Sequence, residues 1–356
     1  LSIELVHQGT ATAAADRLSK FVSDSIQSGT SHNVRRLTRL GTLDADNKFV
    51  ANAKNATFLF HRDFMEYHKE RFEDFSLMVF DAKDKLVALL PAHKINDTLY
   101  SHQGLTYGGL VLGQKVILSE VILILKDILE FLHKNVISKI ELKIIPSIYN
   151  IFPSDEMEYI CFLLEAKLSR RDALAVLDIE NQISISRVRK RGIEKGIANG
   201  LEVKEENNFT SFWNELLIPN LKERYDANPV HSLAEITFLK SKFPNQIKQY
   251  NVYQEDIIVG GVTVFETDNV IHPQYISGNK AFNNELGGLD FLYHHLISTV
   301  YKNEKYFDFG ISNENHGKQV NQSLHYWKES FGARTIVQNF YSIETNSFTK
   351  LETVLI

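Results

Sequence analysis

The chain has 356 residues, of which 44% are hydrophobic and 23% are charged, and both fractions are ordinary for soluble globular proteins. Its formal net charge of −5 gives no global sign of nucleic-acid binding, so we expect small-molecule partners and no nucleic acid. A chain of this length exceeds what one hydrophobic core usually supports, which indicates two domains.

A single cysteine excludes an intrachain disulfide and a thiolate metal cluster, and we expect no metal. Cys161 lies in the apolar run 159–164, where a buried thiol is expected. The longest apolar stretch, 116–132, is too polar to span a bilayer. We therefore expect a cytoplasmic protein, as a monomer or homodimer. Residues 1–32 form an N-terminal extension without a signal-type pattern, and the sequence assigns it no role.

The first half predicts a three-stranded meander followed by alternating helices and strands. Apolar periodicity and turn residues place strands at 75–80, 86–91 and 98–102, a helix at 117–135, a strand at 139–145, a helix at 154–166 with Ser154 as N-cap, and a strand at 174–179.

The second half repeats this order with different residues. Strands are expected at 247–253, 257–266 and 270–277, then a helix at 287–302, a strand at 306–311, a helix at 320–330 and a strand at 335–343. This repetition predicts two mixed α/β lobes, at 33–182 and 183–356, linked by helices at 185–199 and 209–225. Pro273 cannot donate to a ladder, so it indicates a bulge or an edge within its strand.

The passage from strand 270–277 into the next helix carries glycines at its start. Gly287 and Gly288 let a backbone approach a diphosphate closely, and the unpaired amides of a helix start favour negative charge. The alternative is a tight turn in which the two glycines only give the helix a flexible start.

Two stretches of the second half carry a family resemblance. Residues 307–312 read Phe-Asp-Phe-Gly-Ile-Ser, and residues 328–333 read Lys-Glu-Ser-Phe-Gly-Ala. With the predicted elements around them, they resemble the C-terminal lobe of GNAT-superfamily N-acyltransferases related to the Fem peptidoglycan-bridge transferases. Residues 55–62 and 101–109 are similar to the first lobe of that group. The resemblance implies an α/β (α+β) fold with two tandem GNAT-like lobes, each a mixed, mostly antiparallel sheet flanked by helices.

The resemblance also implies a coenzyme A thioester as acyl donor. The positions that would hold it are Ile276, Ser277, Gly278, Gly287, Gly288, Leu289 and Asn321, although Asn321 could instead only cap its helix. The positions that would contact the acceptor are His102, Tyr107, Tyr275, Arg187 and Arg191. One departure from the GNAT pattern is Glu285, an acid beside the expected phosphate.

Three residues are candidates for the chemistry. His272 could accept the proton of the attacking amine because imidazole titrates near neutral pH, or it could be a packed strand histidine. Asp308 alternates with two phenylalanines and could enter the cleft, or be a structural carboxylate. The resemblance implies that Lys328 contacts a substrate phosphate; the alternative is a lysine that only interacts with the helix dipole near the last turn.

A basic group is expected at the junction of the lobes. It consists of Arg170, Arg171, Arg187, Arg189, Lys190, Arg191 and Lys195. Such a run along a helix is usually a solvated face, but bidentate arginines also suit the diphosphate of a nucleotide sugar.

The leading hypothesis is an N-acyltransferase that moves an acyl group from acyl-CoA to the amino group of a nucleotide-linked amino sugar, for surface polysaccharide biosynthesis. One alternative is a Fem-type transferase that uses aminoacyl-tRNA to build a peptidoglycan bridge. The acidic net charge and the lack of a long heptad-bearing helical arm speak against it. A second alternative is a non-catalytic GNAT-like binding protein, which Glu285 favours.

Overall fold

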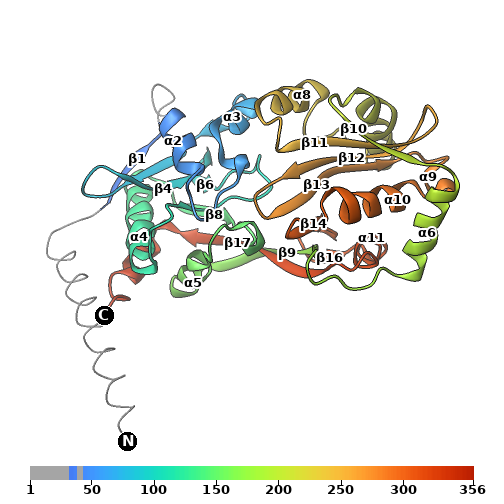
Figure 1. Cartoon of the computed structure of the whole chain (residues 1–356). Coiled ribbons are helices and arrows are strands. Elements are labelled where there is room, and N and C mark those ends of the chain that lie inside the picture. Colours follow the sequence, from blue (N-terminus) through green and yellow to red (C-terminus); the bar gives the residue numbers. More distant parts are fainter. Residues whose placement is uncertain (1–31, 38–42) are drawn as a thin grey trace, which may run out of the picture.

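The computed structural model describes residues 32–37 and 43–356 (Figure 1). Residues 1–31, which make up nearly all of the predicted N-terminal extension, lie outside the described residues. The described strands form three sheets, of eleven, four and two strands. None of the helices in the described part combines the length and the apolar character needed to cross a bilayer.

The first half of the chain supplies the whole four-stranded sheet and part of the eleven-stranded sheet. Its elements are β1 (Asn33–Arg36), α2 (Leu43–Val50), η1 (Phe58–Phe60), α3 (Arg62–Met65), η2 (Glu66–His68), β2 (Glu73–Asp74), β3 (Leu77–Phe80), β4 (Leu86–Leu90), β5 (His93–Ile95), β6 (Thr98–Tyr100), β7 (Val111–Leu112), α4 (Leu118–Lys134), β8 (Lys139–Lys143), η3 (Ser147–Tyr149), α5 (Glu156–Leu163) and β9 (Lys167–Asp178).

The second half follows with a similar order of strands and helices. Its elements are α6 (Arg187–Ala198), β10 (Glu202–Glu206), η4 (Phe212–Leu217), α7 (Ile218–Tyr225), α8 (Leu233–Lys242), β11 (Ile247–Gln254), β12 (Ile257–Glu266), β13 (Val270–Gly278), α9 (Asn283–Leu286), α10 (Gly288–His295), η5 (Leu296–Val300), β14 (Tyr306–Ile311), β15 (Asn313–Glu314), β16 (Gln319–Val320), α11 (Gln322–Glu329), β17 (Arg334–Glu344) and η6 (Thr345–Leu351).

The large sheet runs through both halves without a break, in the order β10-β11-β12-β13-β14-β9-β17-β8-β6-β5-β2. Strand β9 lies between β14 and β17, and β17 lies between β9 and β8. Each half of the chain thus supplies a strand that pairs with the other half. Figure 1 shows β9 and β17 at the middle of the molecule, where this exchange joins the two ends.

Two parallel strand pairs mark the internal repeat. Strands β6 and β8 are parallel, and α4 connects them; β13 and β14 are parallel, and α10 lies between them in the chain. The other pairs in the large sheet are antiparallel. The predicted mixed, mostly antiparallel sheets flanked by helices are therefore confirmed. The lobe boundary at residues 182 and 183 stays a prediction.

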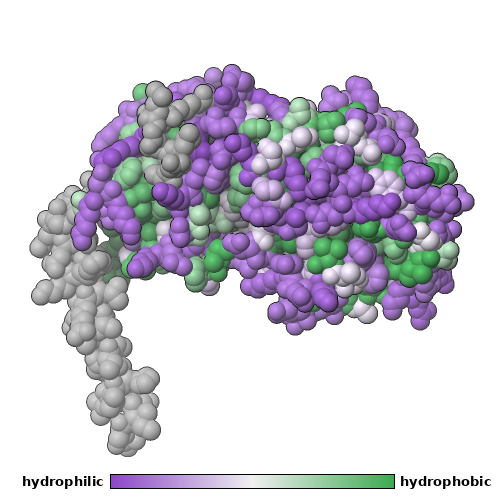
Figure 2. All heavy atoms as spheres, turned by 45° about the horizontal axis from the view of Figure 1, so that its top comes forward, coloured by the Kyte–Doolittle hydropathy of each residue, from purple (hydrophilic) through white to green (hydrophobic). Residues whose placement is uncertain are grey.

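The helices pack through apolar stripes. Val121, Ile124, Leu125, Ile128 and Leu132 recur at helical spacing along α4 and are all buried in the core of the first half. Helix α10 packs against β11 and β12 in the second half. Figure 2 shows polar side chains over most of the visible face, with apolar side chains in smaller areas between them.

Several predicted elements differ in detail. Helix α5 begins at Glu156 with Asp155 at its N-cap; the predicted N-cap Ser154 is wrong, because its hydroxyl donates to the Glu156 carboxylate instead. The predicted helix at 287–302 is divided into α10 and a π-helical turn, η5. Cys161 is buried as predicted, and burial raises the pKa of its thiol to about 12.

Candidate functional site

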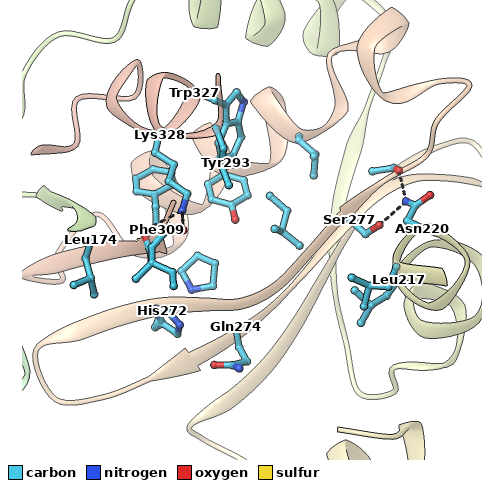
Figure 3. A pocket seen from close by; sticks show the side chains of 18 of the residues that line it. Leu174, Leu217, Asn220, His272, Gln274, Ser277, Tyr293, Phe309, Trp327 and Lys328 are labelled. Atoms are coloured by element: carbon cyan, nitrogen blue, oxygen red, sulfur yellow. Dashed lines mark hydrogen bonds between the residues drawn. The ribbon is translucent and has the colours of Figure 1, made fainter. Parts of the chain in front are cut away.

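The main cavity of the described structure opens where β13 and β14 separate. The two strands pair only at Val270 with Tyr306 and Ile271 with Phe307, at the start of each strand. Beyond these pairs, the edge of β13 faces a cavity of about 930 Å³ instead of a neighbouring strand. Figure 3 shows this cavity between β13, the two helices that carry Tyr293 and Lys328, and the helix that carries Asn220.

Local irregularities allow the two strands to diverge. The register of β12 against β13 shifts between Thr263 and Val264, so that Gln274 is an extra residue on β13. This confirms the bulge or edge predicted from the neighbouring Pro273. Strand β14 is irregular between Asp308 and Ile311, and Gly310 has a φ of +73°, which favours glycine.

His272 lies at the apex of the split and lines the cavity. Its Nδ1 is 3.1 Å from the carbonyl oxygen of Asp308 and 3.5 Å from Oδ2 of the same residue. Because both of these oxygens accept, Nδ1 is the nitrogen that carries the proton in the neutral ring. The lone pair of Nε2 is then left for a group in the cavity.

Asp308 lies behind His272 and is fully buried, so it is not among the residues that line the cavity. Its carboxylate accepts hydrogen bonds from the Tyr149 hydroxyl (2.7 Å) and the Gly310 amide (2.7 Å). Burial pushes the pKa of Asp308 upward, but the hydrogen bond and charge of His272 and these other donors outweigh it and hold the pKa below its usual value. The Asp308 carboxylate is therefore an ionised group beside His272, while the Asp308 carbonyl oxygen accepts the hydrogen bond that orients the ring.

Lys328 reaches the cavity from α11 and is only 5% exposed. Its Nζ donates to the carbonyl oxygens of Gly310 (3.0 Å) and Ile311 (2.5 Å). Burial lowers the pKa of Lys328 to about 8, against an opposing effect of the Asp308 charge. The structure thus brings His272, Asp308 and Lys328 together around the irregular segment of β14.

The residues of β13 that were predicted to bind the acyl donor lie along the far side of the cavity. Ile276, Ser277 and Gly278 all line it. Asn220 on α7 donates to the Ser277 hydroxyl (2.6 Å) and to the Gly278 carbonyl (2.9 Å), and Figure 3 shows both bonds. This amide therefore ties α7 to the end of β13.

At the start of α10, one backbone amide that could bind a phosphate is already hydrogen-bonded to a side chain of the protein. The Asn283 side chain accepts a hydrogen bond from the Leu289 amide (2.8 Å), so that amide is not free to meet a phosphate in this structure. Gly287 has a φ of +78° and packs against α6, where an added Cβ would lie 2.1 Å from the Gly192 carbonyl oxygen. Gly288 is buried against Val259.

A second cavity of about 420 Å³ lies beside the start of α10 and shares four lining residues with the main cavity: Asn283, Asn284, Leu289 and Trp327. Arg191 and Lys195 of α6 line it, and neither makes an ion pair within the described residues. The neighbouring Arg189 differs, because it pairs with Asp290. Arg187 is exposed and lines neither of these cavities.

Four other predicted residues lie away from the cavity. Tyr107 is buried against Tyr149, and its hydroxyl meets Thr57 at 2.9 Å. Tyr275 points to the opposite face of β13 and meets His231 at 2.5 Å. His102 packs among Phe72 and His93. Asn321 caps α11 by accepting from the Leu324 amide at 3.1 Å.

Sequence reasoning missed one wall of the cavity. Five residues line this wall: Lys143, Arg170, Asp172, Gln338 and Phe340. Of these, only Arg170 was named from the sequence, as part of the basic group at the lobe junction. The alternation of Arg170, Asp172 and Leu174 along one strand was the available signal, since these side chains share a face. Among the described residues, no cluster of three or more His, Cys, Asp or Glu side chains could hold a metal ion.

The fold is shared with several solved structures. FemX aligns over 90% of this chain and 99% of its own, with a TM-score of 0.63 and 11% identity. A conserved protein of unknown function from Bacteroides thetaiotaomicron aligns over 88% and 99%, with a TM-score of 0.55 and 8% identity. L-PGS from Bacillus licheniformis aligns over 77% and 85%, with a TM-score of 0.50 and 11% identity.

No protein-family model and no curated protein sequence matches the chain. At the identities above, structural likeness establishes the fold alone. The resemblance read from the sequence is confirmed at that level: the chain has a GNAT-like fold related to that of the Fem transferases.

Proposed function

We propose that the protein is an N-acyltransferase that transfers an acyl group from a coenzyme A thioester to an amine. The observation that carries this proposal is the split between β13 and β14, with His272 at its apex and a 930 Å³ cavity beyond it. The split leaves a free strand edge beside an imidazole whose Nδ1 is already occupied. Such an arrangement suits an extended ligand that ends at a proton acceptor.

The donor would lie along the free edge of β13. The amide groups of a pantetheine arm can hydrogen-bond to an unpaired strand edge as an added strand would. The diphosphate would then approach the second cavity, where Arg191 and Lys195 supply positive charge. It would contact the Leu289 amide only if the Asn283 side chain moved aside.

The transfer step requires one bond to form and one to break. The amine nitrogen attacks the thioester carbonyl, and the tetrahedral intermediate then expels the sulfur as the carbon–sulfur bond breaks. Nε2 of His272 would take the proton of the amine and return it to the departing thiolate. Lys328 would lower the energy of the negative charge that develops on the carbonyl oxygen, because its ammonium group lies in the cavity wall.

The acceptor is proposed to be the amino group of a nucleotide-linked amino sugar, made for a surface polysaccharide. Support comes from the basic side chains that line the main cavity in a chain whose net charge is −5. Such a lining favours an anionic substrate.

A Fem-type, aminoacyl-tRNA-dependent transferase is the second candidate. The likeness to FemX over 99% of that chain favours it. The two candidates differ in donor, so parallel assays separate them. Release of free thiol from a panel of CoA thioesters, with mass spectrometry of the acylated product, is expected for the first. If only aminoacyl-tRNA supports product formation, the second replaces it; if neither donor is used or raises the melting temperature, the chain is a non-catalytic binding protein.

A further inference from the structure

The main cavity is far more basic than the chain as a whole. The described residues that line it include five basic side chains, Lys143, Arg170, Arg224, Lys280 and Lys328, and one acidic side chain, Asp172. The whole chain has 39 Lys and Arg against 44 Asp and Glu. A concave site with one sign of charge focuses the potential and concentrates ligands of the opposite sign.

Three of the lining residues form a lateral row on the central sheet. Lys143 on β8 lies opposite Phe340 on β17, and Phe340 lies opposite Arg170 on β9. In the next row on the same face of the sheet, Gln338 lies opposite Asp172. Two cations thus flank one aromatic ring, at 5.8 Å (Lys143) and 4.7 Å (Arg170) from its centroid.

Neighbouring groups satisfy these two cations only in part. Asp172 takes one edge of the Arg170 guanidinium through two hydrogen bonds, of 2.9 and 2.7 Å. Lys143 donates to the Leu105 carbonyl at 2.8 Å, and it makes no ion pair within the described residues. Burial first, and then the charge of Arg170, lower the pKa of Lys143 to about 8. The pair therefore carries an uncompensated positive charge beside the cavity.

We infer that Lys143, Phe340 and Arg170 form the subsite for a phosphate or diphosphate carried by the acceptor. The inference deepens the proposed function and rests on it for the identity of the ligand as acceptor. Asp172 holds the Nε edge of the Arg170 guanidinium, so the remaining donors of Arg170 and the Lys143 ammonium are left for a ligand. A phosphate has three acceptor oxygens and can meet both cations at once. Phe340 offers an apolar surface between the two charges for a ring of the same ligand.

The position of the row also limits the shape of the acceptor. Leu174 lies opposite Ile311, close to the split, whereas Arg170 is four residues further along β9. At 3.3 Å per residue, this is a separation of roughly 13 Å along the strand. The phosphate of the acceptor therefore lies far from its reacting amine, which excludes short amines such as phosphorylated ethanolamine.

Inorganic pyrophosphate is the probe, measured by isothermal titration calorimetry. The parent and every variant in this titration also carry Arg191→Gln and Lys195→Gln, so that the cations of the second cavity do not contribute to pyrophosphate binding. Lys143→Met and Arg170→Gln are each expected to raise the dissociation constant by about tenfold or more, as for loss of one charge-assisted contact. Two matched controls should change it by less than about twofold. These are Arg171→Gln, exposed on the other face of β9, and Lys139→Gln at the far end of β8.

Lys143→Met keeps the test valid if loss of Arg170 unfolds the protein by leaving Asp172 buried and unpaired. The inference is overturned if pyrophosphate binds this variant as it binds the parent, or does not bind the parent at millimolar concentration. Equal binding of malonate and pyrophosphate would overturn the assignment to phosphate. Failure of the proposed function would look different: no thioester would be consumed, while pyrophosphate binding still depended on Lys143.

Discussion

His272 is held by the backbone of Asp308 more closely than by its side chain: Nδ1 lies 3.1 Å from the carbonyl oxygen and 3.5 Å from Oδ2. The carbonyl fixes the tautomer, and the buried carboxylate adds a negative charge beside the ring. Removing the charge and removing the imidazole should therefore have different consequences.

His272→Ala should lower kcat by about 10²- to 10⁴-fold, the usual contribution of a positioned proton acceptor. The KM for the thioester should change little, because the strand edge remains. Initial rates of thiol release measure both constants. His133→Gln, at an exposed site on α4, serves as the matched control and should retain full activity. A variant at His272 that kept its full kcat would remove the residue from the mechanism.

Asp308→Asn should alter the acid stability of the protein. The pKa of Asp308 is lower in the folded state than in the unfolded chain, so its ionised form stabilises the fold. That contribution is fully present above the unfolded value, about 4, and is lost as the pH falls through the lower folded pKa. Urea unfolding between pH 2 and 6 should show a smaller acid-induced loss in the variant than in the parent. Identical pH dependence would show that the carboxylate does not stabilise the fold.

Lys328 should set an alkaline limit to activity. Its pKa is about 8, so its positive charge is lost as the pH rises through that value. The pH–rate profile of the parent should fall near pH 8. Lys328→Arg should extend the plateau, since arginine stays charged, and Lys328→Met should be slow throughout. Lys143 has a similar pKa, so a Lys143→Gln variant serves as the control. If Lys328 causes the loss of activity near pH 8, the rate of this variant should still fall there.

The same lowered pKa of Lys328 gives a stability prediction with the same sign as that of Asp308, at alkaline pH instead of acid pH. Between about pH 8 and the unfolded value of 10.5 the unfolded chain binds more protons at Lys328 than the folded chain does, so stability rises with pH. Relative to Lys328→Met, the parent should therefore gain stability across this window in urea unfolding. A constant difference between the two proteins would contradict the buried, shifted lysine.

Gly287→Ala should destabilise the protein by more than the left-handed backbone alone requires. The φ of +78° costs a non-glycine residue about 1–2 kcal/mol, and the new Cβ would also lie 2.1 Å from the Gly192 carbonyl oxygen. Gly200 has a φ of +65° and open space around it, so Gly200→Ala measures the backbone cost by itself. Thermal unfolding of both should give a clearly lower melting temperature for Gly287→Ala. Equal losses would show that α6 moves away from α10 freely.

Arg191→Gln combined with Lys195→Gln should weaken binding of coenzyme A by about tenfold or more, because both cations lie beside the expected diphosphate. Pantetheine, which lacks the diphosphate, should bind the variant and the parent equally. Calorimetric titration of both ligands makes the comparison, with Lys190→Gln as an exposed control on the same helix. Equal weakening of both ligands would place the diphosphate elsewhere.

The sequence predicted the elements whose side-chain pattern is set by local burial. Strands 257–266 and 306–311 match β12 and β14 at both ends, since each is an apolar run bounded by turn residues. Strand β9 was predicted only from 174, because residues 167–172 are mostly polar. They are a strand because β17 pairs with them, and that partner comes from the far end of the chain.

For the site, the sequence was enough, through the family resemblance of its second half, to name His272, Asp308 and Lys328, which lie together beside the split. It could not determine that Asp308 lies behind His272, or that Asn283 occupies the start of α10. Nor could it place Lys143, Phe340 and Arg170 in one row, because their alignment depends on the register of three strands far apart in sequence. Periodicity fixes the face to which a side chain points, whereas only tertiary pairing decides which side chains meet there.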